Sequence, residues 1–502
     1  MDAYTGAHPG NPILARVEHG LWTFLLFAVP VSATPLLPFG SGTLARPLAA
    51  FPAALLLLLA AFRILFLGQK PRLAGGGFGL LGLFTAYIVV CGLVLASLAP
   101  PDAFKGQTPM DSFLRALMTW AMGLAFYLVA RLNIRSDADI RHALRCLFVG
   151  MTASIAFATV QVMAIVEHGE LLRVVQAITD LFAVHYDGLS SRAQGMTFEP
   201  SWLASQIIAF LMPALIASSI SQRKFVNLPA ARGHMLRLAG GFAIAIGGLL
   251  CSGSRFGLVC IAAMLVLSGL MAARRGHMLV AASFLLVLAA GGGGLMAMSR
   301  LGAGAGASYV VGPISYLTGA ANLDSTGPDV AAGVTDTLAL AGRVAAAEAA
   351  GDMWLDHPLF GVSLGNDYRY FGKYAPDWAF TTDLFTQGAK EGEGWLDPNS
   401  PEKGNAKNFF LRLLAETGLV GFVLFGLFLV RHLFRGPARD DYHAYFRLAT
   451  AMALGFSFLN QDSFVETGIW IPLVLCFAMN RAPAKMSTAP LLSGNRPAPA
   501  SV

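Results

Sequence analysis

The sequence predicts an all-α integral membrane protein of about twelve transmembrane helices, with one long extramembrane loop between the ninth and the tenth. The first observation is composition: of 502 residues, 55% are hydrophobic and only 13% are charged, and the mean hydropathy is +0.60. Soluble domains carry about 25% charged residues. The second observation is that apolar runs of about 20 residues, the length that crosses a bilayer, recur along the chain. A soluble core of this composition would lack polar residues to cover its surface.

Apolar runs separated by polar loops give the positions of the expected spans. The N-terminal run LWTFLLFAVPVSAT is interpreted as a retained first helix rather than a signal peptide, because many further apolar segments follow it. The predicted spans are 21–39, 48–67, 78–99, 112–130, 143–166, 202–221, 237–252, 256–273, 278–297, 408–430, 444–459 and 464–480.

Basic residues orient these spans, because lysine and arginine collect in cytoplasmic loops. They alternate from loop to loop along the chain, so both termini are expected on the cytoplasmic side. The net charge of +6 therefore reflects membrane topology and not binding to nucleic acid. The basic loop residues are Arg63, Lys70, Arg72, Arg131, Arg135, Arg141, Arg145, Arg223, Lys224, Arg232, Arg237, Arg274, Arg275, Arg431, Arg435, Arg439, Arg481 and Lys485.

Four regions follow from this topology. The longest loop contains a predicted helix, DTLALAGRVAAAEAAGDMWLDH, and an aromatic, polar stretch that suits a sugar-binding surface. The C-terminal tail is rich in Pro, Ala and Ser and is expected to be disordered. The regions are 1–297, with nine helices and a noncytoplasmic segment at 167–200; the loop domain 298–407; 408–485, with the last three helices; and the tail 486–502.

No cofactor or metal is expected from the motifs. The five cysteines show neither the spacing of a zinc site nor that of a disulfide framework. The chain has no His-Glu zinc motif and no phosphate-binding P-loop. Nucleotide hydrolysis is therefore not expected to supply energy here.

Four basic residues break the charge bias, because they fall on the noncytoplasmic side near the ends of spans: Arg192, Arg255, Arg343 and Lys407. Arginine carries a planar fork of donors that fits a phosphate, and it stays charged. If the four face one cavity, they would bind an anion such as a lipid pyrophosphate. The alternative is that each arginine caps a helix or extends to lipid headgroups.

Two carboxylates and two other polar residues accompany these cations. Glu199 lies at a loop–membrane boundary, where it could accept a proton from a hydroxyl, and Glu416 lies about three turns inside a predicted span. A structural ion pair is the competing interpretation for each carboxylate. His357 precedes Pro358, so it is expected to be extended and to have a structural or substrate-contact role rather than a catalytic one. Asn408 opens the tenth span beside Lys407.

The order of these motifs resembles the O-antigen polymerase and ligase superfamily, the Wzy and WaaL type of membrane glycosyltransferase. RAQGMTFEPSWLA is similar to the family's Arg, Gly, Glu-Pro segment, and SGSRFG to its Ser-Arg turn. GRVAAAEAAGDMWLDHPLFGVSLGN resembles the family's arginine followed by an HPLFGxGxGN-like passage. KNFFLRLLAETGLVGF has the family's spacing of Asn, Gly and Gly after the long loop. The resemblance covers about residues 80 to 480.

The resemblance implies a metal-independent transfer of a growing glycan from undecaprenyl pyrophosphate to a new lipid-linked repeat unit. It implies an active site on the periplasmic face of the bacterial inner membrane. Arg192, Arg255, Arg343 and Lys407 would bind the pyrophosphate. Glu199, with Glu416 as second choice, would be the base, while His357 and Asn408 would contact substrate. A chain-length regulator is a possible partner.

One departure separates the branches of the family. Ligases of this family have a histidine directly before the asparagine, where this chain has Lys407. A lysine of ordinary pKa is a cation and a poor base, so the substitution favours a polymerase. The alternatives are an O-antigen ligase or a protein O-oligosaccharyltransferase of the same superfamily. A secondary transporter is the alternative of another class, although no repeat relates the two halves of the chain.

Overall fold

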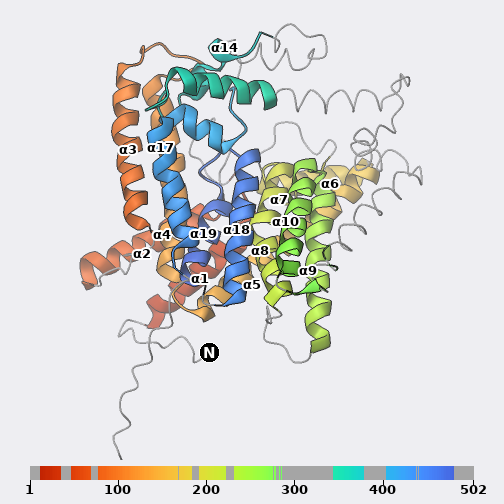
Figure 1. Ribbon diagram of the computed structural model, residues 1–502. Helices are drawn as coiled ribbons and strands as arrows, with labels where there is room; N and C mark the ends of the chain where they lie inside the picture. Colours follow the sequence, from red (N-terminus) through yellow and green to blue (C-terminus); the bar gives the residue numbers. More distant parts are fainter. Residues whose placement is uncertain are drawn as a thin grey trace, which may run out of the picture.

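The computed structural model is helical throughout the part of the chain that it describes, apart from turns and two isolated bridges (Figure 1). This confirms the all-α class. The ninth predicted span, 278–297, lies almost wholly outside the described residues, as does most of the long loop. The described residues are 12–35, 47–68, 77–167, 169–183, 192–221, 231–274, 276–278, 282, 284, 343–377, 403–436, 438 and 440–479.

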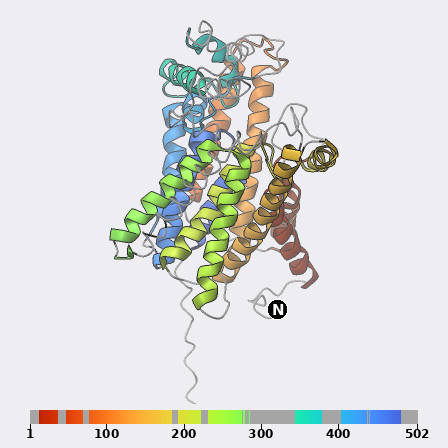
Figure 2. The ribbon, with the colours of Figure 1, turned by 90° about the vertical axis from the view of Figure 1, so that its right-hand side faces the viewer.

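Most helices run side by side and form a bundle (Figures 1 and 2). Seven helical stretches of the described part are long and apolar enough to cross a membrane, which supports an integral membrane protein. The helices are α1 (Pro12–Ala28), α2 (Ala50–Leu67), α3 (Phe78–Leu98), α4 (Pro109–Asn133), α5 (Asp137–Glu167), α6 (Gly169–Phe182), α7 (Pro200–Gln206), the π-helical turn η2 (Ile207–Leu211), α8 (Met212–Ser221), α9 (Ala231–Ser252), α10 (Arg255–Arg274), η3 (Asp367–Arg369), α14 (Phe371–Tyr374), α17 (Phe409–Phe434), α18 (Asp441–Asn460) and α19 (Thr467–Met479).

The first helix differs from the prediction. A span at 21–39 was expected, but α1 ends at Ala28 and the chain continues without helix through residue 35. Proline disrupts a helix interior, and this stretch contains Pro30 and Pro35. The helix starts earlier than expected, and Glu18 in its first half pairs with Arg63 of α2 at 2.7 Å.

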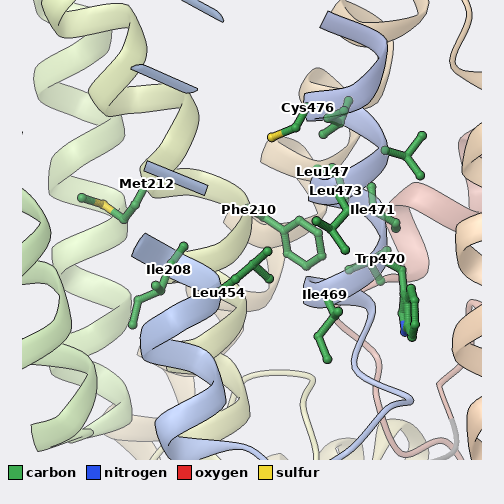
Figure 3. Packing of buried hydrophobic residues seen from close by; sticks show 14 of the residues in the cluster. Leu147, Ile208, Phe210, Met212, Leu454, Ile469, Trp470, Ile471, Leu473 and Cys476 are labelled. Carbon is green, nitrogen blue, oxygen red and sulfur yellow. The ribbon is translucent and has the colours of Figure 1, made fainter. Parts of the chain in front are cut away.

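The core lies around α19, whose side chains are all buried. The ring of Trp470 lies 5.4 Å from that of Trp120 in α4, and Trp120 lies 5.0 Å from Phe464. Figure 3 shows Phe210 of η2 beside Leu473 of α19. These contacts explain why the apolar sequence of α19 forms a central helix, although it is shorter than a full membrane span.

Helix α17 is interrupted at Gly418, which has φ 62° and ψ −171°. Segment 358–362 of the long loop supplies partners for the interrupted backbone. Leu419 N–H donates to the carbonyl of Pro358 at 2.8 Å, and Val362 N–H donates to that of Ala415 at 2.9 Å. A neighbouring helix, α3, approaches only Gly421; Gly418 is approached by the loop.

Replacing Gly418 by alanine is expected to lower thermal stability, because this backbone conformation is nearly exclusive to glycine and costs about 1–3 kcal/mol otherwise. A Cβ at this position would also lie 2.3 Å from the carbonyl carbon of Leu359. The measurement is the midpoint of thermal unfolding of the purified protein in detergent. Gly426→Ala is the matched control, since a Cβ there meets nothing within 4 Å and alanine favours a helix. Equal midpoints for the two variants would show that position 418 does not require glycine.

Candidate functional site

Several helices end at one end of the bundle, the upper end in Figure 1, and hydrogen bonds connect polar and charged residues of these ends. The contributing parts are the segment 192–199, the start of α7, the end of α18 and the loop helix at 343–356. Apolar helices carry these residues to their ends, where backbone groups and side chains can meet a polar substrate.

Hydrogen bonds made by two consecutive residues, Asn460 and Gln461, connect Arg343 to Glu199. Arg343 Nη1 donates to Oδ1 of Asn460, the last residue of α18, at 3.0 Å. The next residue, Gln461, uses its Nε2 to donate to the hydroxyl of Ser201 at 3.4 Å. Ser201 in turn donates to the carboxylate of Glu199. The end of α18 therefore holds the loop arginine and the start of α7 in one arrangement.

Arg192 belongs to the same group. Its Nε donates to the carbonyl of Ser252, at the end of α9, at 3.1 Å. Desolvation lowers the pKa of Arg192, Glu199 raises it and Arg343 lowers it, so Glu199 and Arg343 both lie within electrostatic range of Arg192. The guanidinium stays protonated because its ordinary pKa is above 12. Two of the four predicted cations and the predicted base are thus brought together.

The third predicted arginine, Arg255, is the first residue of α10. It follows Ser252, which accepts from Arg192, by three positions, so its backbone lies at the same end of the bundle. Its side chain lies outside the described part of the structure. Its contact with a ligand stays a prediction.

Asn408 and Lys407 begin α17 in the way the sequence suggested. Oδ1 of Asn408 accepts hydrogen bonds from the N–H groups of Phe410 at 3.0 Å and Leu411 at 3.2 Å, so it caps the helix. Such a cap is worth about 0.5–2 kcal/mol. Lys407 is half-buried and has a positive φ of 46°. Capping accounts for Asn408 without a ligand, and its substrate contact stays a prediction.

Glu416 is buried inside a second polar group. Its Oε1 accepts from Arg412 Nε at 3.0 Å and from the N–H of Gly365 at 2.9 Å. Arg412 Nη1 also donates to the carbonyl of Asp462 at 2.7 Å. Of the two interpretations of Glu416, this placement favours the structural ion pair, because Oε1 already accepts two hydrogen bonds and the side chain is buried away from a substrate hydroxyl.

Asp367, in the short helix η3, lies beside the same ion pair. Burial raises the pKa of Asp367, Arg412 lowers it and Asp462 raises it again. Arg412, which is half-buried, therefore faces three carboxylates from three parts of the chain. Breaking a buried pair by removing one partner costs about 3–5 kcal/mol. This group links α17, the long loop and the α18–α19 connection.

His357 ends the loop helix at 343–356. Its N–H donates to the carbonyls of Met353 and Trp354, both at 3.1 Å, so it completes a helical turn instead of lying in an extended segment as predicted. Its side chain is exposed, and its ring lies 6.3 Å from that of Tyr370. The imidazole of His357 is exposed and is not part of the group formed by Arg192, Arg343 and Glu199. Its contact with substrate stays a prediction.

The residues that connect these groups lie outside the motifs named from the sequence, and so does Lys403. The connecting residues are Ser201, Arg412, Asn460 and Gln461. Two signals were available: the i,i+4 spacing of Arg412 and Glu416, which is typical of a helical ion pair, and the polar run NQDS between two apolar spans.

Lys403 lies just before α17, with its ammonium 4.5 Å from the ring centre of Tyr368. Burial, Arg115 and Lys105 lower its pKa and Asp367 raises it, with a net value of about 8. As the pH rises through 8, Lys403 therefore loses its proton, whereas an ordinary lysine stays an ammonium until about pH 10.4.

Amine acylation across pH is expected to label Lys403 with a half-point near pH 8, because only the neutral amine reacts. Lys373 is the control: Tyr374 and Asp356 raise its pKa, so its half-point is expected above the ordinary value. Peptide mass spectrometry measures both in one sample. Coincident curves for the two lysines would show that Lys403 has an ordinary amine.

Among the described residues, no group of three or more His, Cys, Asp or Glu side chains is placed to hold a metal ion. The polar groups above are built from guanidinium, carboxylate, amide and hydroxyl groups. This set of side chains can bind an oxyanion and accept a proton.

The O-antigen ligase family model matches residues 240–426, from α9 to the middle of α17. The match includes Arg343, Lys407, Asn408 and Glu416, while Arg192 and Glu199 precede it. No curated protein matches the sequence. Members of the family are glycosyltransferase-like enzymes that act on lipid-linked glycans in a membrane. Together with the apolar helices, the match supports the O-antigen polymerase and ligase superfamily and a multi-pass membrane protein.

Proposed function

We propose that the protein is a Wzy-type polysaccharide polymerase. It would transfer a growing glycan from undecaprenyl pyrophosphate onto a new lipid-linked repeat unit at the periplasmic face of the inner membrane. The observation that carries the proposal is the grouping of Arg192, Arg343 and Glu199 at one end of the bundle, in a chain of this superfamily.

In the proposed reaction, a hydroxyl oxygen at the nonreducing end of the new repeat attacks the anomeric carbon of the donor glycan. The bond from that carbon to the pyrophosphate oxygen breaks, and undecaprenyl pyrophosphate leaves with the electron pair. The hydroxyl proton passes to the carboxylate of Glu199, which Ser201 orients. The glycosyl pyrophosphate bond supplies the free energy, so neither a nucleotide nor a metal is needed.

The cations act on the leaving group. Negative charge grows on the pyrophosphate as its bond to carbon breaks, and fixed positive groups stabilise that charge without reorganisation. Arg192, Arg255, Arg343 and Lys407 are proposed for this role. Arg343 lies on the long loop, so the loop supplies one of the proposed cations.

The proposed topology places both termini in the cytoplasm. Residues 298–407 would form the periplasmic loop domain that selects the sugar, with a second periplasmic segment at 167–200. Residues 1–297 and 408–485 would hold the spans, and 486–502 a cytoplasmic tail. A chain-length regulator would contact the protein on the periplasmic side of the membrane, where the loop domain lies.

The second candidate is an O-antigen ligase or protein O-oligosaccharyltransferase, which the family match supports equally. Lys407 favours the polymerase, because an ammonium can neutralise a phosphate but is a poor base at neutral pH. The two activities differ in their acceptor, so the acceptor is what an experiment must vary.

The test uses purified protein in proteoliposomes with lipid-linked repeat units as the only glycan. A polymerase is expected to produce a ladder of longer lipid-linked chains. A ligase or oligosaccharyltransferase would leave the repeats unchanged until core lipid or an acceptor protein is added. The absence of product under all conditions, with intact repeats and folded protein, would contradict both.

A further inference from the structure

Helix α6 has an apolar face that is wider than the protein covers. Val175 and Thr179 are buried against the rest of the molecule. On the neighbouring side of the helix, Val174, Ile178 and Leu181 are 54%, 38% and 65% exposed. Spacings of four and three place these three side chains in one row along the helix. We refer to this row as the α6 stripe.

The charged residues of α6 lie on its other side. Arg173 forms an ion pair with Glu170, and Gln176 donates to Asp180 at 2.7 Å. Both pairs are local and exposed, and they belong to the helix itself. A helix with an exposed apolar row and a separate charged side is typical of one that lies in a membrane interface.

The orientation of α6 fits this interpretation. It runs across the bundle near the ends of α7 and α10 in Figure 1, and Figure 2 shows it nearly end on beside the upright helices. The exposed apolar surface also continues from α5 onto α6. The last three turns of α5, a candidate membrane span, expose Val160, Met163 and Val166.

A buried glutamine of α5 connects α6 to the candidate site. Gln161 Nε2 donates to Thr179 Oγ1 of α6 at 3.1 Å and to the carbonyl of Gly195 at 3.0 Å. Its Oε1 accepts from the N–H groups of Gln194 at 3.0 Å and Gly195 at 2.7 Å. Gly195 lies between Arg192 and Glu199. One side chain therefore joins α6 to the segment that carries both site residues.

We propose that the α6 stripe docks into the lipid leaflet on the side of the candidate site. Gln161 then holds the segment from Arg192 to Glu199 at a set height above the acyl chains. An interfacial helix buries its apolar face about 5–10 Å into the boundary between headgroups and acyl chains. If the proposed function holds, on which this last step rests, α6 places the cations at the level of the lipid-linked pyrophosphate.

The first test measures the depth of the stripe in full-length protein in nanodiscs, with a nitroxide on Ile178→Cys. Accessibility to oxygen, which concentrates in lipid, is expected to exceed accessibility to a water-soluble nickel chelate. Asp180→Cys, on the charged side, is expected to show the reverse order. Leu93→Cys, exposed in the span α3, is the lipid reference, and the unsubstituted protein gives the background of the native cysteines.

Two outcomes would overturn the docking step. Nickel accessibility at Ile178→Cys equal to that at Asp180→Cys would place the stripe in water. Strong spin–spin broadening that vanishes on dilution with unlabelled protein would mean that a second copy covers the stripe. Neither measurement needs substrate, so a failed proposed function would leave both readable.

The second test concerns the link through Gln161. Gln161→Leu removes the acceptor of the amides of Gln194 and Gly195. Each amide loses one buried hydrogen bond, so its exchange rate, read in the peptide that contains 192–199, is expected to rise about tenfold. Met163→Leu, on the exposed side of the same helix, is the control. Unchanged exchange in Gln161→Leu would remove the glutamine from the proposal.

Discussion

Replacing Glu199 by glutamine is expected to lower the rate of glycan transfer by about 10²–10⁴-fold, the contribution of a positioned general base. Glutamine keeps the size of the side chain and an oxygen that accepts from Ser201, but it cannot take a proton. The initial rate of chain extension from purified lipid-linked repeats measures the effect. The unfolding midpoint is expected to stay near that of the unsubstituted protein, because the change is isosteric.

The control for Glu199→Gln is Asp352→Asn, which makes the same chemical change at an exposed position of the helix at 343–356. It is expected to retain the full rate. A Glu199→Gln protein that extends chains at the rate of the control would show that the proton goes elsewhere. Another group near Arg192 would then have to accept the proton.

Replacing Arg343 by alanine is expected to lower the same rate by about 10²–10³-fold, the usual cost of losing one preorganised group that stabilises transition-state charge. Its guanidinium is held at 3.0 Å by Asn460, so it is already oriented before the leaving group becomes charged. Arg343→Lys keeps the charge but not the planar fork, and an intermediate rate is expected.

Two further variants separate charge from position. Asn460→Ala keeps the Arg343 side chain but removes the hydrogen bond that orients it. A smaller loss of transfer rate than for Arg343→Ala is therefore expected. Arg173→Ala removes an exposed arginine on α6 and is expected to leave the rate unchanged. If Arg343→Ala and Arg173→Ala have equal rates, Arg343 is a structural contact between the loop and α18 and not part of the anion site.

Much of the fold could be predicted because a membrane span is recognised from a continuous run of apolar residues. The helices from α2 to α5, and α17 and α18, lie within a few residues of the predicted spans. Helix α1 was misplaced because its N-terminal half contains charged residues, one of which pairs with Arg63 across the fold. Helix α6 was missed because its 14 residues are too few for a span and polar residues alternate with the apolar ones, a pattern that is hard to separate from a loop.

The candidate site was predicted in part. Arg192, Glu199 and Arg343 were named from local motifs, and the fold brings them together. Glu416 was named as a possible base, but its partners are Arg412, four residues earlier, and Gly365, which is distant in sequence. The ion pair of Arg412 and Glu416 could be predicted from their spacing of four residues. The contact of Glu416 with the loop at Gly365 could not.

By itself, the sequence determined the all-α membrane class and the approximate positions of most described spans, and it pointed to a superfamily that the family match supports. Composition, apolar run length and short motifs are local properties, so no tertiary information is needed to read them. Only the tertiary structure decided which charges share one space and which are buried in pairs. Contacts such as Arg343 with Asn460 and Gln161 with Gly195 join parts of the chain that are 117 and 34 residues apart. Whether such groups meet depends on how the helices pack.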